Sequence, residues 1–275
     1  GEPATRKWVD AAKGARPEVR SEVLTMLGRR GDASAYPAVA YAINDADSTI
    51  RASAIDAVVR LSTGEAIPPC LSLLRRSQEG SDITAVRKAL DRLPSAQVIP
   101  WVVEALPHVT APASVMLTDL IGKYGTVVPV GPIVDLCRNN NASVRLAAIK
   151  ALGTVATDKD QSHLIAVLLA AQEEPEQSAA QKSLASVCSR IGEPENRAEK
   201  VLEAYGNASL DQRRTLLRAL GRIGGKKALA VIAENVRSKD ADTRDAAVRA
   251  LADWPTIEAY DSLLTIAKSK EKLNL

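Results

Sequence analysis

At 275 residues the chain could hold one large domain or two average ones, so length alone does not fix the number of domains. Its hydrophobic share of 46% is ordinary, but Phe is absent and aromatic residues make up only 3%, so small aliphatic side chains must form the core. Such a core suits closely packed helices better than strands. The net charge of +3 does not by itself indicate a nucleic-acid partner, and no apolar run approaches the length needed for membrane insertion.

One amphipathic helix pattern recurs along the whole chain. Its central apolar residue, which we call the register residue, stands at Leu27, Val58, Leu90, Ile121, Leu152, Cys188, Leu220 and Leu251. Apolar residues stand four before it in every copy and three after it in every copy except the first, which has Arg30 there, and they give these helices one buried face. The register residues are spaced by 31 or 32, with one step of 36. A period near 31 with helical patterning is typical of a solenoid of helix pairs.

A second, less regular set of helices runs between these and comes first in each pair. Its early copies carry Pro37, Pro68, Pro100 and Pro132, which mark helix starts or early kinks. We count nine of these first helices and eight second helices, the last first helix at about 257–269 having no partner. The pattern predicts an all-α, right-handed α–α superhelix of about nine helix pairs. We expect residues 1–275 to form a single solenoid that is a fragment of a longer chain.

The 36-residue step lies near an acidic stretch, "EEPEQ" at 173–177. We interpret this stretch as a longer surface loop, which solenoids tolerate at repeat junctions. Two units that melt independently, divided at this step, would indicate two domains instead of one.

The segments "NDADSTIRASAIDAVVRL" and "VRSKDADTRDAAVRALADW" resemble HEAT repeats of the short bacterial type. The resemblance covers essentially the whole chain and implies a binding scaffold whose second helices line a concave side. The segment "RALADWPTIEAYDSLLTIAKS" is also similar to HEAT segments of exported Bacteroidetes-type multidomain proteins. That likeness favours an exported or periplasmic location over a cytoplasmic one.

An arginine early in the second helix carries much of the resemblance. In the family it pairs with an acid of a neighbouring repeat. The matching residues are Arg20, Arg51, Arg145, Arg213 and Arg244, and the column fails at Ile83, Ser114 and Gln181. Asp47 and Asp240 lie four residues before Arg51 and Arg244. We interpret these arginines and aspartates as structural groups that satisfy helix ends and hold the stacked repeats together.

Residues that carry chemistry are scarce. His108 and His163 form no His-Glu pair, which HEAT-type hydroxylases need for iron. The cysteines at 70, 137 and 188 are far apart, so neither a zinc site nor a disulfide framework is indicated. No nucleophile elbow, Walker A or dinucleotide motif occurs. We expect no catalytic residue, metal or cofactor, and any enzymatic activity would belong to an attached domain.

One basic column stands out two residues after the register position. Six of its eight residues are basic: Arg29, Arg60, Arg92, Lys123, Arg190 and Arg222. They lie on the helix face opposite the buried stripe and would line the groove. The alternative is a solvated face, since the helix dipole alone favours a cation in the last turn by about 0.3–1 kcal/mol. Asp56, Asp119 and Asp253 dilute the charge.

The sequence therefore favours a non-catalytic scaffold that binds another protein or an attached domain, and the basic column would suit an anionic partner. Two alternatives stay open: a nucleic-acid-binding or base-processing HEAT-like protein, and a lyase-type HEAT module. Trp8, Trp101 and Trp254 are scattered and are better explained by packing. Because this face has no stacking platform of aromatic residues, nucleic acid is the less favoured partner.

Overall fold

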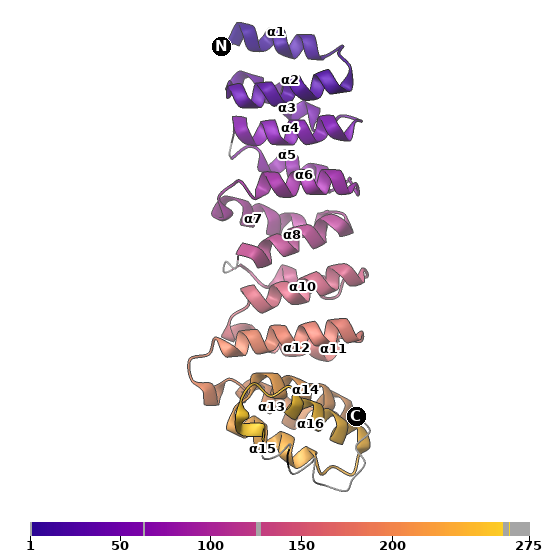
Figure 1. Ribbon diagram of the computed structural model, residues 1–275, viewed down its shortest axis with the longest axis vertical. Helices are drawn as coiled ribbons and strands as arrows, with labels where there is room; N and C mark the ends of the chain where they lie inside the picture. Colours follow the sequence, from indigo (N-terminus) through magenta and orange to yellow (C-terminus); the bar gives the residue numbers. More distant parts are fainter. Residues whose placement is uncertain (1, 63, 125–127, 261–263, 265–275) are drawn as a thin grey trace. The chain divides into compact units, whose positions relative to one another are not determined.

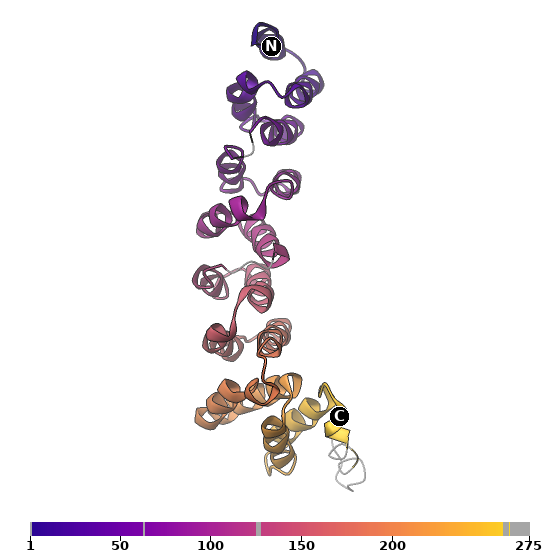
Figure 2. The ribbon, with the colours of Figure 1, turned by 90° about the vertical axis from the view of Figure 1, so that its left-hand side faces the viewer.

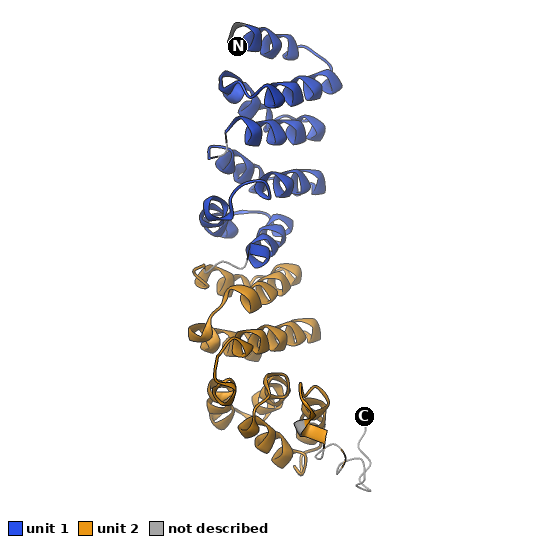
Figure 3. Ribbon diagram, turned by 60° about the vertical axis from the view of Figure 1, so that its left-hand side comes forward, with its two compact units in different colours: residues 1–124 blue, residues 125–275 orange. Residues whose placement is uncertain are grey.

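The computed structural model describes residues 2–62, 64–124, 128–260 and 264 (Figure 1). These residues contain sixteen α-helices, short 3-10 turns and no strand. The alternation of first and second helices confirms the predicted all-α solenoid. The chain divides into two compact units, residues 1–124 and residues 125–275 (Figure 3). A single solenoid over 1–275 remains a prediction, and each unit is described by itself.

Unit 1 holds four helix pairs. The first helices are α1 (Glu2–Ala12), α3 (Tyr36–Ala42), α5 (Ile67–Leu74) and α7 (Ser95–Ala105). The second helices are α2 (Pro17–Arg30), α4 (Ser48–Leu61), α6 (Gly80–Leu90) and α8 (Ala111–Tyr124). Within this unit the two sets form two rows (Figure 2). The 3-10 turns η1 (Ala33–Ala35) and η2 (Leu106–His108) lie in its connections.

Unit 2 repeats the arrangement. Its first helices are α9 (Gly131–Leu136), α11 (Gln161–Ala170), α13 (Glu199–Asn207) and α15 (Lys226–Asn235). Its second helices are α10 (Ala142–Val155), α12 (Glu174–Ser189), α14 (Leu210–Ile223) and α16 (Ala241–Ala252). The 3-10 turns are η3 (Asp158–Asp160), η4 (Pro194–Asn196) and η5 (Ile257–Ala259). The described residues thus contain eight pairs, and the expected ninth first helix at 257–269 lies largely outside them.

Local sequence explains where the helices begin. The side chain of Asn141 accepts hydrogen bonds from the backbone amides of Ser143 and Val144 at the start of α10. Ser209 forms a capping box with Gln212 at the start of α14. Prolines lie in the first turn of α3, α5 and α9, as expected. Pro100 differs, because it lies inside α7.

The core corrects one register assignment. Counted from the first residue of each second helix, the eleventh residue is buried and aliphatic in all eight: Leu27, Val58, Leu90, Ile121, Leu152, Leu184, Leu220 and Leu251. The sequence register placed Cys188 here, one helical turn too late. Leu184 and Cys188 are both fully buried, and residues four apart share a helix face. The periodicity of apolar residues therefore could not show which of the two is equivalent to the register residues of the other helices.

The corrected register also moves the long step. It runs from Leu184 to Leu220, and the last turn of α12 and the connection through η4 take up the extra residues. The acidic stretch at 173–177 was expected to be a surface loop, and this expectation is wrong. Glu173 is the N-cap residue of α12, the following residues form its first turn, and Glu176 is buried. Acidic residues suit this place because the helix dipole favours negative charge at an N-terminus.

Glycines allow three pairs of second helices to approach closely. Gly28, Gly153 and Gly221 are each the twelfth helix residue, and they face Ala57, Ser183 and Ala250, each the tenth residue of the next second helix. A Cβ at position 221 would lie 2.7 Å from the Cα of Ala250. The Gly153–Ser183 contact also supports the corrected register. It makes Ser183 the equivalent of Ala57 and Ala250, so the next residue, Leu184, is the equivalent of Val58 and Leu251.

We expect Gly221→Ala to lower the free energy of unfolding by about 1–3 kcal/mol, since the added methyl group overpacks the α14–α16 contact. The control is Gly206→Ala in α13, where a Cβ meets nothing within 4 Å. That variant should be neutral or slightly more stable, because alanine favours the helix. Urea unfolding followed by circular dichroism measures both. Equal stability of the two variants would contradict the close approach.

Candidate functional site

The candidate site is the surface of the second helices that faces away from the first helices, which we call the second-helix surface. Two grooves lie on it, one between α4 and α6 and one between α10 and α12, and both are lined only by residues of, or just after, second helices. Helix positions are counted below from the first residue of each second helix. The basic column expected from the sequence falls on position 13.

In unit 1 the position-13 cations form ion pairs with acids of their own chain. Asp56 accepts a hydrogen bond from Nε of Arg60 at 2.8 Å and also pairs with Arg92 of the next second helix. Asp91 pairs with Nζ of Lys123 at 2.7 Å and with Nε of Arg87 at 3.2 Å. These contacts make an ion-pair ladder across α4, α6 and α8.

The ladder shifts the protonation of its acids. Partial burial raises the pKa of Asp56, but hydrogen bonds from Arg60 and Arg92 outweigh it and hold that pKa below its usual value. Lys123 and Arg87 act in the same way on the pKa of Asp91. Arg29 is the position-13 cation of unit 1 without an ion pair to any described residue. Three of the four position-13 cations of unit 1 are therefore already paired, and Asp56 and Asp91 offset part of the column's positive charge.

In unit 2 the column is broken. Arg222 on α14 pairs with Asp253 at 2.9 Å, and its Nε donates to Gln181. Arg190 does not belong to the column, because position 13 of α12 is Ser186. The guanidinium of Arg190 donates to the carbonyl oxygens of Gly153 and Ala156 at 2.9 and 2.6 Å, at the end of α10. Arg190 was assigned to the column because the sequence register of α12 was set at Cys188, one helical turn after the correct residue, Leu184.

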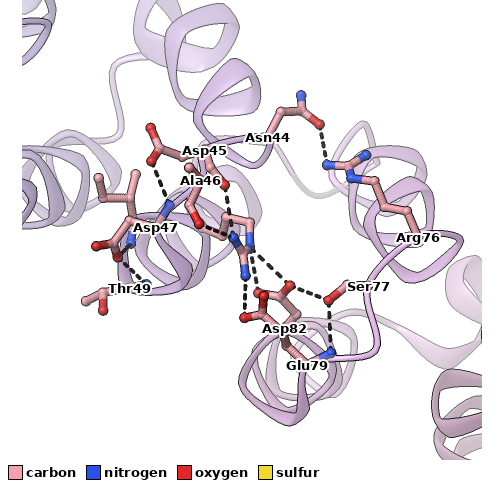
Figure 4. Close-up of polar contacts among 11 residues, drawn as sticks. Asn44, Asp45, Ala46, Asp47, Thr49, Arg76, Ser77, Glu79 and Asp82 are labelled. Carbon is pink, nitrogen blue, oxygen red and sulfur yellow. Dashed lines mark hydrogen bonds and ion pairs between the residues drawn. The ribbon is translucent and has the colours of Figure 1, made fainter.

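The arginine column at position 4 joins neighbouring repeats, and Arg51 shows its geometry best. Its Nε donates to both carboxylate oxygens of Asp82 at 2.9 and 3.0 Å, and another nitrogen reaches Glu79 at 2.6 Å. A third nitrogen donates to the carbonyl oxygens of Asp45 and Ala46, just after α3. Ser77 donates to Asp82 at 2.6 Å, so this fully buried carboxylate has several partners (Figure 4).

We call this arrangement the position-4 fork: one guanidinium binds the carbonyl oxygens that follow a first helix and an acid of the next second helix. Arg145 repeats it in full, and the other arginines of the column repeat it in part. Arg145 pairs with Glu176 at 2.7 Å and caps the carbonyl oxygens of residues 139 and 140. Arg213 and Arg244 donate to carbonyl oxygens at 205–206 and 238–239, and Arg20 pairs with Asp45. In α12 the position belongs to Gln177, which donates to the carbonyl oxygens of Ala171 and Gln172. The arginine column thus fails at Gln177 and not at Gln181, because Gln177 is the fourth residue of α12 in the corrected register.

Asp47 and Asp240 are helix caps. Asp47 accepts hydrogen bonds from the amides of Thr49 and Ile50, and Asp240 accepts from the amide of Thr243 at 2.8 Å. Asp240 also pairs with Arg214 of the preceding second helix at 2.9 Å. The acids that pair with Arg51 and Arg145 lie instead in the next second helix, at Asp82 and Glu176. These two residues are not among those expected from the sequence.

The described residues contain no group of three His, Cys, Asp or Glu side chains that could hold a metal ion. Burial raises the pKa of Cys70 to about 12 and that of Cys188 to about 11, so both are neutral thiols at physiological pH. In the same part of the chain, no helix has the length and apolar character required to cross a membrane.

The tryptophans only partly fit the packing role that we expected. Trp254 is buried, but Trp8 and Trp101 are each 45% exposed. These two lie on the first helices α1 and α7 and so are not part of the second-helix surface.

We expect Asp82→Asn to lower the free energy of unfolding by about 3 kcal/mol, because it leaves the buried Arg51 guanidinium without its main charge partner. Asp119→Asn is the control, since Asp119 is exposed and forms no ion pair with any described residue. Urea unfolding of both variants at pH 7 tests this. A loss no larger than that of the control would show that the fork does not hold the repeats together.

The ladder predicts a pH dependence. Because the folded-state pKa of Asp56 is depressed, its contribution is present above the unfolded pKa near 4 and is lost as pH falls through the lower folded value. Asp56→Asn should therefore lower the melting temperature at pH 7 and lower it less near pH 3. Thermal melts at both values check it, and an equally large difference at pH 3 would argue against the ion pairs as its cause.

Comparison with known families gives a match to the model described as HEAT repeats over residues 5–91 and 198–273, which is more than half of the chain. No curated protein matches the sequence. Among solved structures, the crystal structure of an engineered protein is 16% identical to this chain, with a TM-score of 0.45. The alignment covers 96% of this chain and 82% of that one. With paired helices, a repeat near 31 residues and the family match together, the chain belongs to the HEAT-repeat family.

Proposed function

We propose that this chain is a non-catalytic scaffold that binds another protein along its second-helix surface. The observation that carries the proposal is the recurrence of an open groove at equivalent helix positions in both units. Each groove includes positions 5 and 9 of one second helix and positions 1, 2, 5, 6, 9, 10 and 13 of the next. A surface built by repetition can extend along an elongated partner.

Small side chains keep these grooves open. Between α4 and α6 the walls include Ala52, Gly80, Ser81, Thr84 and Ala85, around a volume of about 370 Å³. The groove between α10 and α12 has a volume of about 420 Å³ and is lined by similarly small residues. Recesses of this size can accept side chains of a partner that lies across the helices. Grooves on helical surfaces bind peptides in this way.

The grooves, more than the position-13 column, form the proposed docking site. Arg60, Arg92 and Lys123 already hold Asp56 and Asp91. An anionic partner at these three cations would have to displace these acids, and exposed ion pairs are worth too little to make that exchange favourable. In unit 1 the partner is therefore recognised mainly by shape and by contacts with small apolar side chains.

The test fills the grooves without changing charge. Thr84→Tyr blocks the groove between α4 and α6, and Ser178→Tyr blocks the one between α10 and α12. Ser72→Tyr, on the exposed side of the first helix α5, is the control. Affinity capture from the source cells with quantitative mass spectrometry should show proteins that are retained by the parent and the control but depleted at least several-fold by the groove variants.

Proteins retained equally by all three variants would move the site away from the second-helix surface. Partners lost only with Ser72→Tyr would place it on the first helices. If nuclease treatment releases the captured material, the nucleic-acid alternative replaces the proposed one. Circular dichroism spectra of the variants confirm that each is folded before capture.

A further inference from the structure

The corrected register reveals a second basic column, at position 9 of the second helices of unit 2. Its residues are Lys150, Lys182, Arg218 and Arg249. In unit 1 the same position holds Thr25, Asp56, Lys88 and Asp119. The original register placed Ser186 in this column instead of Lys182 and so concealed its continuity.

Three of these four cations have no acid partner among the described residues. Lys150 and Lys182 are exposed and form no ion pair there. Arg218 also forms none, and its Nε is buried without a hydrogen-bond acceptor. Arg249 differs, because its Nε pairs with Asp245 of its own helix at 2.7 Å.

Lys150 and Lys182 also line the groove between α10 and α12, together with the small side chains of Thr154, Ser178 and Ala179. The other two serines there are engaged, since Ser183 and Ser186 donate to the carbonyl oxygens of Ile149 and Gly153. Glu174 is the one acid lining the groove, and it lies at the N-terminal end of α12. The equivalent groove in unit 1 contains Asp56 already paired with arginine.

The spacing of the column limits what it can bind. Packed helices lie about 8–10 Å apart, and the Gly153–Ser183 contact brings α10 and α12 close together. A polyproline II chain makes one turn in three residues with a rise of about 3.1 Å each, so every third side chain returns to the same face after roughly 9 Å. A β-strand returns after about 6.6 Å, which fits the spacing less well.

From this match we propose that Lys150, Lys182 and Arg218 bind an extended acidic polypeptide in the polyproline II conformation, with a carboxylate at every third residue. The proposal rests on the proposed function and names the partner class for unit 2. The carboxylates meet the three cations in turn, while the intervening residues lie over the small side chains of the groove.

The experiment uses the whole chain and two fluorescein-labelled synthetic peptides of identical composition. One repeats Glu-Pro-Pro four times, and the other carries its four glutamates in one block. Fluorescence anisotropy at low salt should show tighter binding of the repeating peptide, by up to about fivefold for each additional surface ion pair that it forms. Added salt should weaken it, because exposed ion pairs are screened.

Charge reversal tests the residues. The double variant K150E/K182E should weaken binding of the repeating peptide by at least about tenfold, since two contacts become repulsive. The control K200E/K227E changes net charge equally at exposed lysines on the first helices α13 and α15, and it should bind almost as the parent does.

If K150E/K182E and K200E/K227E lose equal affinity for the repeating peptide, the assignment of the binding site to the position-9 column is overturned. Equal binding of the two peptides, or tighter binding of a single-stranded oligonucleotide of equal charge, would show that charge density and not spacing governs recognition and would also overturn it. If neither peptide binds while Ser178→Tyr still depletes captured proteins, this inference fails and the scaffold proposal stands. If peptide binding survives K150E/K182E and capture survives both groove variants, both proposals fail.

Discussion

Each helix pair in this chain can bury its apolar face only against the neighbouring pair, and the rest of the structure follows from that constraint. The eleventh residue of all eight second helices is a fully or nearly fully buried aliphatic side chain. Because no aromatic residue fills these positions, second helices pack closely, and Gly28, Gly153 and Gly221 bring pairs of them together. The stability of each repeat is therefore shared with its neighbours, and so is the alignment of its outer surface.

The position-4 forks fix that alignment. One guanidinium binds the carbonyl oxygens at the end of the preceding first helix and, in the case of Arg51 or Arg145, a buried acid in the next second helix. A planar donor group with a fixed geometry tolerates little sliding between repeats. The fork thereby keeps equivalent positions of successive second helices in register, which is what turns separate side chains into columns and grooves.

Much of this could be read from the sequence because it depends on local patterns. The helix period, the caps at Asp47 and Asp240 and the positions of the arginines follow from residues close together in the chain. The acids that pair with Arg51 and Arg145 did not, since Asp82 and Glu176 lie about one repeat away and an acid stands at this third helix position in only these two second helices. The register of α12 failed for another reason: Leu184 and Cys188 are both buried, and a pattern that records only burial cannot choose between them.

The two basic columns also differ in what they imply. Position 13 lies in or just after the last turn of most second helices, where the helix dipole favours a cation whether or not a partner exists. Asp56 and Asp91 then neutralise much of that charge in unit 1. In α10, α12 and α14, position 9 lies more than one turn before the helix end, where the dipole effect has fallen off, whereas Arg249 lies in the last turn of α16. Cations that recur there without acid partners need a different explanation, and a ligand that carries the missing negative charge provides one.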